Sequence, residues 1–123
     1  LVVPVIRETN SKNIREIAGE VKTLADAAKD GILGPDDFMG GTFTISILGS
    51  VDGFTPILNQ SQVGLLGVGR SLQKPIVKDG QIVIREMMTL SLTGDHQVVD
   101  GAVAASFFRR LQRLIESPSK LFA

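Results

Sequence analysis

The sequence predicts an α/β fold in which a mixed β-sheet carries helices on one face. Two segments repeat apolar residues every three or four positions, as amphipathic helices do, and several others alternate apolar and polar residues, as half-buried strands do. In chain order these segments are a strand, a helix, several strands and a last helix, which is typical of a mixed sheet. With 123 residues, the chain has the size of one domain or of part of one.

The first segment, "LVVPVIR" at residues 1–7, is apolar and is expected to form a strand. Pro4 would place it at a sheet edge or at a strand entry, since proline cannot donate to a ladder. The chain starts at Leu1 inside this apolar run, without a polar lead-in. We therefore expect that a preceding part of the domain is missing from this chain.

Residues 11–31 predict an amphipathic helix. Ser11 or Asn13 can cap its N-terminus, and Glu16 lies three residues after Asn13, as a capping box requires. Gly31 is expected to end the helix.

The middle of the chain predicts strands. The segment "GTFTISILG" alternates, "VGLLGVG" is almost wholly apolar and is expected to be covered on both faces, and "PIVKDGQIVI" has the Asp-Gly signature of a hairpin turn. Together with "MMTLSLTG", these segments occupy residues 41–49, 63–69, 75–84 and 87–94.

A last helix is expected from Asp100, as its N-cap, to about Glu116, with Pro118 after its end. Apolar residues at helical spacing predict a buried stripe formed by Val103, Phe107, Phe108, Leu111, Leu114 and Ile115.

Composition excludes several kinds of chemistry. The chain has no cysteine, which rules out disulfides, thiolate-bound zinc, iron–sulfur clusters and a cysteine nucleophile, and its one histidine rules out a multi-histidine metal site within one copy. Thirteen basic and thirteen acidic residues give no net charge that would favour nucleic acid or an anionic membrane. The chain has neither an apolar run of ~20 residues nor a signal-peptide pattern, so we expect no membrane association and a cytoplasmic protein, or a mitochondrial matrix protein in a eukaryote.

Three residues are candidates for catalysis. His96 lies just after a predicted strand, and functional residues are common in loops at strand ends. Asp95 and Asp100 flank it and offer carboxylates that could orient the imidazole. Ser46 lies on the polar face of the alternating strand. Each also has an ordinary interpretation: a structural histidine, a helix cap for Asp100 and a solvent-facing serine.

The sequence lacks three common motifs of catalytic and nucleotide-binding sites. Ser46 is not in a G-x-S-x-G elbow, "GLLGVG" is not a dinucleotide fingerprint, and there is no glycine-rich phosphate loop. One general base, one or two carboxylates and a few hydroxyls suit acyl transfer to an external nucleophile, without fixing the substrate.

Several motifs follow one another as in a known family. The segments "GGTFTISILG", "FTPILNQSQVGLLGVGR", "KPIVKDGQIVIREMMTLSLTGDH" and "DHQVVDGA" resemble, in order and spacing, the catalytic domain of the dihydrolipoyl acyltransferases of 2-oxo acid dehydrogenase complexes. The resemblance covers essentially the whole chain. It implies a chloramphenicol-acetyltransferase-like, two-layer sandwich. Residues 1–123 would be the C-terminal part of that catalytic domain, and its N-terminal half, the lipoyl domain and the subunit-binding domain would lie outside this chain.

The resemblance also implies roles for the candidate residues. His96, in the D-H-x-x-x-D-G motif, would be the general base, Asp100 would support the geometry of the site, and Ser46 would donate a hydrogen bond to the oxyanion. The serine and the histidine would meet across a subunit boundary, so that a single copy would be inactive.

The family implies coenzyme A as a substrate, a lipoyl group carried on another domain and no metal. Its partners would be further copies, as trimers that build a hollow core, together with the decarboxylating dehydrogenase and dihydrolipoamide dehydrogenase.

The sequence departs from the family at Gln97, Ile47 and Gly94, and these departures bear on rate and acyl preference more than on reaction class. The alternatives are a non-catalytic or truncated acyltransferase-like scaffold and a free-standing coenzyme A-dependent acetyltransferase of the same fold. The segments "FTP" and "LLGVGR" favour an acetyl or branched-chain substrate over a succinyl one.

Overall fold

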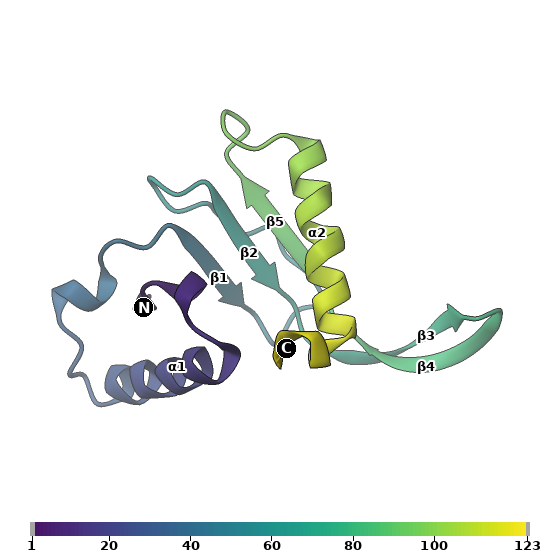
Figure 1. Cartoon of the computed structure of the whole chain (residues 1–123), viewed down its shortest axis with the longest axis horizontal. Coiled ribbons are helices and arrows are strands. Elements are labelled where there is room, and N and C mark those ends of the chain that lie inside the picture. The colour runs from purple at the N-terminus through teal and green to yellow at the C-terminus, as the bar shows by residue number, and fades with distance from the viewer. Residues whose placement is uncertain (1, 123) are drawn as a thin grey trace. The chain divides into compact units, whose positions relative to one another are not determined.

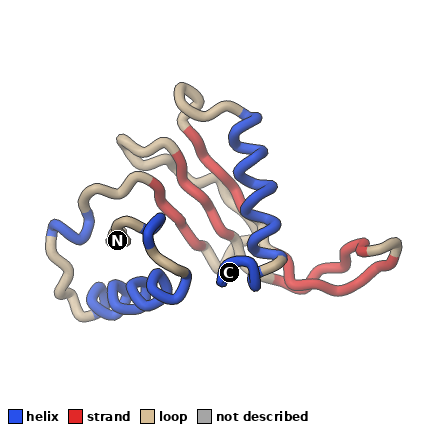
Figure 2. The backbone as a smooth tube through the Cα atoms, viewed as in Figure 1, coloured by secondary structure: helices blue, strands red, loops and turns tan. Residues whose placement is uncertain are grey.

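The computed structural model describes residues 2–122. The chain divides into two compact units (Figure 1), one made of Leu1–Gly41 with Ala105–Ala123 and the other of Thr42–Ala104. Most helical residues belong to the first unit and all strands to the second (Figure 2). None of the helices within residues 2–122 has the length and apolar character that crossing a membrane requires.

The first unit is organised around the predicted N-terminal helix. Helix α1 spans Ile14–Lys29, and its capping box is formed as expected. The side-chain oxygen of Asn13 accepts the N–H groups of Arg15 and Glu16 at 3.0 Å each, and Glu16 accepts the N–H of Asn13 at 2.8 Å. Gly31 follows the helix with a φ of +68°, a conformation that suits glycine at a helix C-terminus.

The unit also contains three short 3₁₀ helices and most of α2. Their bounds are η1 Thr9–Ser11, η2 Pro35–Phe38, η3 Pro118–Phe122 and α2 Gly101–Glu116.

The strand predicted at residues 1–7 is wrong for the residues that the structure describes. Residues 2–7 form no helix or strand and pair with no strand of either sheet. One backbone hydrogen bond, from the N–H of Val5 to the carbonyl of Asp37 at 2.8 Å, links this segment to η2. An apolar, β-branched run favours an extended backbone, but it becomes a strand only beside another strand that supplies a ladder.

The second unit contains a three-stranded mixed sheet. Its strands are β1 (Phe43–Ile47), β2 (Gly64–Val68) and β5 (Leu90–Gly94), in the spatial order β1-β2-β5. Strand β2 runs parallel to β1 and antiparallel to β5. As predicted, this central strand is covered, and Leu65 and Leu66, exposed by 4% and 6%, are the buried apolar core of the described residues.

Strands β3 (Leu72–Lys78) and β4 (Gln81–Met87) form the predicted hairpin. Asp79 and Gly80 have φ angles of +54° and +75°, as the two central residues of a type I′ turn do. The hairpin is a separate two-stranded sheet. The predicted hairpin is thus confirmed, and among the described residues its strands pair with no strand of the three-stranded sheet.

Helix α2 begins after Asp100, as predicted, but its apolar stripe is only partly covered. Phe108, Leu111 and Leu114 are half-buried, whereas Val103, Phe107 and Ile115 are exposed by 56%, 38% and 40%. The predicted buried stripe is therefore covered only in part, with three of its six residues half-buried and three exposed.

Candidate functional site

Ser46 is held by β1 on the more covered face of the sheet. Thr44 and Ser46 are half-buried, whereas Ile45 and Ile47, which point to the opposite face, are exposed by 61% and 69%. Burial along β1 is thus the reverse of the usual pattern, in which apolar residues face the core. Ser46 is therefore half-buried rather than fully exposed to solvent.

A glycine beside Ser46 makes room for two ring side chains. Gly67 on β2 is the register partner of Ser46. A Cβ atom at Gly67 would lie 3.0 Å from the ring of Phe54 and 3.2 Å from the ring of Pro56. Because register partners share a face, Phe54 and Pro56 cover the sheet next to Ser46. Sequence reasoning missed this covering, since only the fold reveals which loop lies over Gly67.

The loop that carries these rings is fastened to the sheet at three points. Arg70 forms an ion pair with Asp52, and its N–H donates to the carbonyl of Val51 at 2.8 Å. The Thr93 hydroxyl donates to the carbonyl of Pro56 at 2.5 Å. The hydrogen bond and the charge of Arg70 lower the pKa of Asp52 below its usual value.

His96 is exposed and lies in the turn that directly follows β5. Asp95 organises this turn: its carboxylate accepts the N–H of Gln97 at 2.9 Å, and its carbonyl accepts those of Val98 and Val99, both at 2.9 Å. The N–H of Asp95 in turn donates to the carbonyl of Val63 beside β2 at 3.0 Å. The turn therefore presents the imidazole from a backbone that is tied to the end of the sheet.

Asp100 caps helix α2. Its Oδ1 accepts the N–H of Val103 at 2.9 Å, and its carbonyl accepts that of Ala104 at 3.1 Å. Among the described residues, no hydrogen bond or ion pair joins the imidazole of His96 to Asp95 or to Asp100. The capping interpretation of Asp100 is thus confirmed. By capping α2, Asp100 fixes the point at which the turn that carries His96 ends and the helix begins.

One copy of the chain does not bring Ser46 and His96 together. Ser46 is level with Gly67 and Ser91, whereas β5 continues past that level to Gly94 before it reaches His96. Strand rise and strand spacing put the Cα atoms of Ser46 and Gly94 about 14 Å apart, and His96 lies beyond that strand end. Figure 1 shows β1 and β5 pointing in opposite directions. The two residues therefore occupy opposite ends of one sheet.

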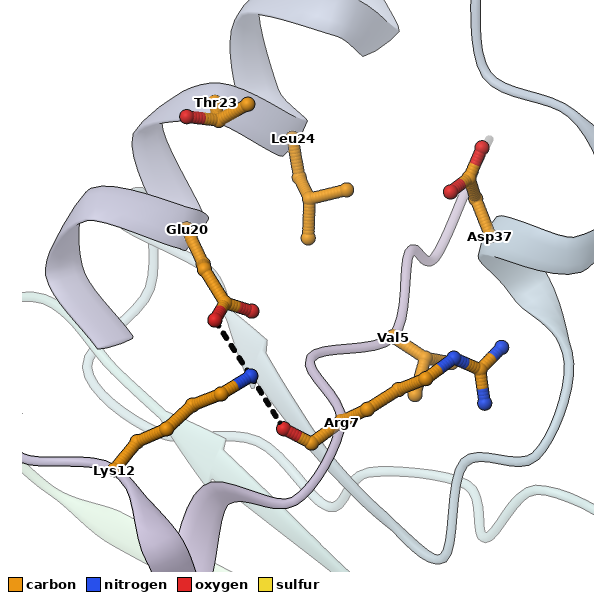
Figure 3. Close-up of a pocket in the computed structure, with 7 residues that line it drawn as sticks. All are labelled: Val5, Arg7, Lys12, Glu20, Thr23, Leu24 and Asp37. Carbon is orange, nitrogen blue, oxygen red and sulfur yellow. Dashed lines mark hydrogen bonds and ion pairs between the residues drawn. The ribbon is translucent and has the colours of Figure 1, made fainter. Parts of the chain in front are cut away.

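A cavity of about 370 Å³ lies in the other unit (Figure 3). Inside it, Lys12 Nζ lies 2.5 Å from a carboxylate oxygen of Glu20 and donates to the carbonyl of Arg7 at 2.6 Å. None of the three candidate residues lines this cavity, whose lining residues are Val5, Arg7, Lys12, Glu20, Thr23, Leu24 and Asp37.

Comparison with known proteins extends over the whole chain. The family model of the 2-oxoacid dehydrogenases acyltransferase catalytic domain matches residues 1–123. A curated relative, the dihydrolipoyllysine-residue acetyltransferase component of the pyruvate dehydrogenase complex of Staphylococcus aureus, is 44% identical over 98% of this chain. The chain spans 29% of the length of that relative.

Two solved structures share the fold. Azotobacter vinelandii dihydrolipoamide acetyltransferase, investigated for the roles of a serine, a histidine and an asparagine in its catalytic mechanism, matches with a TM-score of 0.87 and 42% identity. The cubic core of the pyruvate dehydrogenase multienzyme complex matches with a TM-score of 0.87 and 41% identity. Each match covers 99% of this chain and 51% of the solved one.

These matches confirm the predicted α/β fold with a mixed sheet and its likeness to acyltransferase cores. The chain belongs to the family of 2-oxoacid dehydrogenase acyltransferases and matches their catalytic domain.

Proposed function

We propose that this chain supplies Ser46 and His96 to an acyltransferase that moves an acyl group between dihydrolipoamide and coenzyme A. The observation that carries the proposal is the turn after β5, in which the D-H-x-x-x-D-G motif exposes His96 at the sheet end. Membership of the acyltransferase family supports the reaction class.

The spacing of the candidate residues supports their roles. In the Azotobacter enzyme the investigated histidine and asparagine are four positions apart, which is also the spacing of His96 and Asp100. Its serine precedes that histidine by 52 positions, against 50 positions between Ser46 and His96. Asp100 thus stands in the place of an asparagine, and both residue types cap helices equally well.

In the proposed mechanism His96 takes the proton of a substrate thiol. A thiol of ordinary pKa, near ~8.5, is mostly protonated at neutral pH, so a base that removes the proton during attack accelerates thioester formation. The thiol of coenzyme A adds to the acyl-dihydrolipoamide thioester and forms a tetrahedral oxyanion. The Ser46 hydroxyl donates to that oxyanion, and one such donor is typically worth about 3 kcal/mol. Collapse of the intermediate releases acyl-coenzyme A and dihydrolipoamide, which regains the proton from His96.

A working site would combine Ser46 of one copy with His96 of another. The wide separation of the two residues within one copy supports this arrangement. So does the similarity to a protein described as a cubic core, because such a core consists of many copies. We infer that the protein self-associates.

For the acyl group we propose acetyl. The Staphylococcus aureus relative is an acetyltransferase of the pyruvate dehydrogenase complex. The same likeness supports the decarboxylating dehydrogenase and dihydrolipoamide dehydrogenase as partners.

The test is acyl transfer from acetyl-coenzyme A to dihydrolipoamide by the full protein and by His96→Ala. Loss of a general base should lower kcat by roughly 10²–10⁴-fold. Val98→Ala is the matched control, since this side chain is exposed by 64% in the same turn and has no part in the proposed chemistry. An intact protein that shows no His96-dependent transfer would contradict the proposal, and complete absence of transfer would point to the scaffold function instead.

A further inference from the structure

The connection between β1 and β2 lies over the face of the sheet that carries Ser46. Because register partners share a face, this face has four hydroxyl side chains and one glycine in its middle. Its residues are Thr44, Ser46, Gly67, Ser91 and Thr93. Phe54 and Pro56 belong to the connection, and their rings lie over Gly67.

The connection occupies some of these hydroxyl groups and not others. The Thr44 hydroxyl donates to the side-chain oxygen of Gln62 at 2.7 Å, and the Thr93 hydroxyl donates to the carbonyl of Pro56 at 2.5 Å. The hydroxyl of Ser46 forms no hydrogen bond within residues 2–122. The connection therefore covers the face around Ser46 and leaves this hydroxyl available to a substrate.

The loop 51–56 is the part of the connection that carries Phe54, and its backbone lies very close to the sheet. A Cβ at Gly69 would lie 2.0 Å from the carbonyl oxygen of Asp52, and a Cβ at Gly53 would lie 3.1 Å from Cγ2 of Thr89. The loop can occupy this place only because both positions lack a side chain.

One ion pair holds the start of this loop. Asp52 and Arg70 form it, and within residues 2–122 it is the only ion pair of the unit Thr42–Ala104. The hydrogen bond and the charge of Arg70 lower the pKa of Asp52, so the carboxylate is ionised at neutral pH. Phe54 thus lies between two fastenings, the ion pair before it and the hydrogen bond from Thr93 to Pro56 after it.

We propose that Arg70 is a positioning residue for acyl transfer, which acts through Asp52 to hold Phe54 against the sheet beside Ser46 and so keeps water away from the reacting thioester. This inference rests on the proposed function, in which the Ser46 hydroxyl donates to the oxyanion. A donor of this kind is most effective where water is excluded. Release of the loop admits water, which weakens this contribution and competes with the acceptor thiol.

The competing reaction is hydrolysis of the thioester. Water adds to the carbonyl carbon of acetyl-coenzyme A in place of the thiol, and His96 takes one of its protons and returns it to the sulfur as the C–S bond breaks. The products are acetic acid and coenzyme A, and no acetyl group reaches dihydrolipoamide. The ratio of hydrolysis to transfer therefore reports the position of the loop, whereas a loss of folded protein lowers both rates alike.

The experiment measures both reactions of the full protein. Release of coenzyme A from acetyl-coenzyme A without dihydrolipoamide gives hydrolysis, and formation of acetyl-dihydrolipoamide gives transfer. Arg70→Gln and Asp52→Asn each remove one charge of the pair, and Arg70→Lys keeps the charge. Lys22→Gln is the matched control, because Lys22 forms an exposed ion pair with Asp26 within helix α1. Circular dichroism checks that every variant is folded.

The side chains of Arg70 and Asp52 are exposed by 45% and 58%, so the expected effect is moderate. Arg70→Gln and Asp52→Asn should each raise the ratio of hydrolysis to transfer about two- to fivefold, as loss of an exposed ion pair allows. Arg70→Lys should restore most of the wild-type ratio, and Lys22→Gln should leave it unchanged.

An unchanged ratio in the folded Arg70→Gln and Asp52→Asn proteins would overturn the inference, as would an equal rise in Lys22→Gln. Failure of the proposed function gives a different result, namely a folded wild-type protein without His96-dependent transfer.

Discussion

Replacing Asp100 should separate its capping role from any role in catalysis. Its Oδ1 accepts the N–H of Val103 at 2.9 Å, at the first turn of α2. Loss of such a cap in Asp100→Ala costs about 1 kcal/mol, within a range of ~0.5–2 kcal/mol. The carboxylate also lies at the positive end of the helix dipole, which adds roughly 0.3–1 kcal/mol at an exposed site. The expected total loss in Asp100→Ala is about 1.5 kcal/mol.

Asp100→Asn and Asp100→Ser keep a cap acceptor and lose only the charge, so each should lose about 0.5 kcal/mol. Urea unfolding measures the free energy of unfolding of the wild-type protein and of the alanine, asparagine and serine variants. Equal slopes of this free energy against urea concentration show that the variants expose the same surface on unfolding. If activity depends on Asp100 through the cap, the Asn and Ser variants keep most of it. An alanine variant as stable as the wild type, or a serine variant as unstable as alanine, would refute the capping argument.

Further predictions concern the loop beside Ser46 and the first helix. A Cβ at Gly69 would lie 2.0 Å from the carbonyl oxygen of Asp52, so Gly69→Ala should destabilise the protein by about 1–3 kcal/mol or more. Gly19→Ala in α1 meets no atom within 4 Å and should instead stabilise it by about 0.5–1 kcal/mol; thermal or urea unfolding checks both signs. The pKa of Asp52 is lowered by Arg70, so this pair stabilises the fold above the usual aspartate pKa and stops doing so as the pH falls through the lowered value. Arg70→Gln should therefore raise the pKa of Asp52 in an NMR titration and flatten the stability profile below about pH 4, and an unmoved pKa would contradict the pairing.

Local chemistry explains which elements could be predicted. The capping box of Asn13 and Glu16 and the turn at Asp79 and Gly80 depend on residues that are neighbours in sequence, and both occur as predicted. By contrast, the strand predicted at residues 1–7 is wrong for residues 2–7. Whether an extended segment joins a ladder depends on strands far away in the chain, which alternation does not reveal.

The candidate site was predictable in its parts but not in its geometry. Strand patterning and the family motif identified Ser46, His96 and Asp100 as candidates. Their separation follows from the register, in which Ser46 is level with Ser91 rather than with Gly94. The covering of Gly67 by Phe54 depends on a loop path that no local pattern encodes.

The central claim is that a working site takes Ser46 from one copy and His96 from another. Ser46→Ala and His96→Ala proteins, each nearly inactive, are unfolded together in equal amounts, refolded and assayed for acyl transfer. If the two residues come from different copies, random mixing restores about a quarter of the sites with both groups intact. Activity near a quarter of the wild type, with each variant refolded alone as the control, is the predicted result. If each site used both residues of a single copy, mixing would restore nothing, and that result would contradict the account.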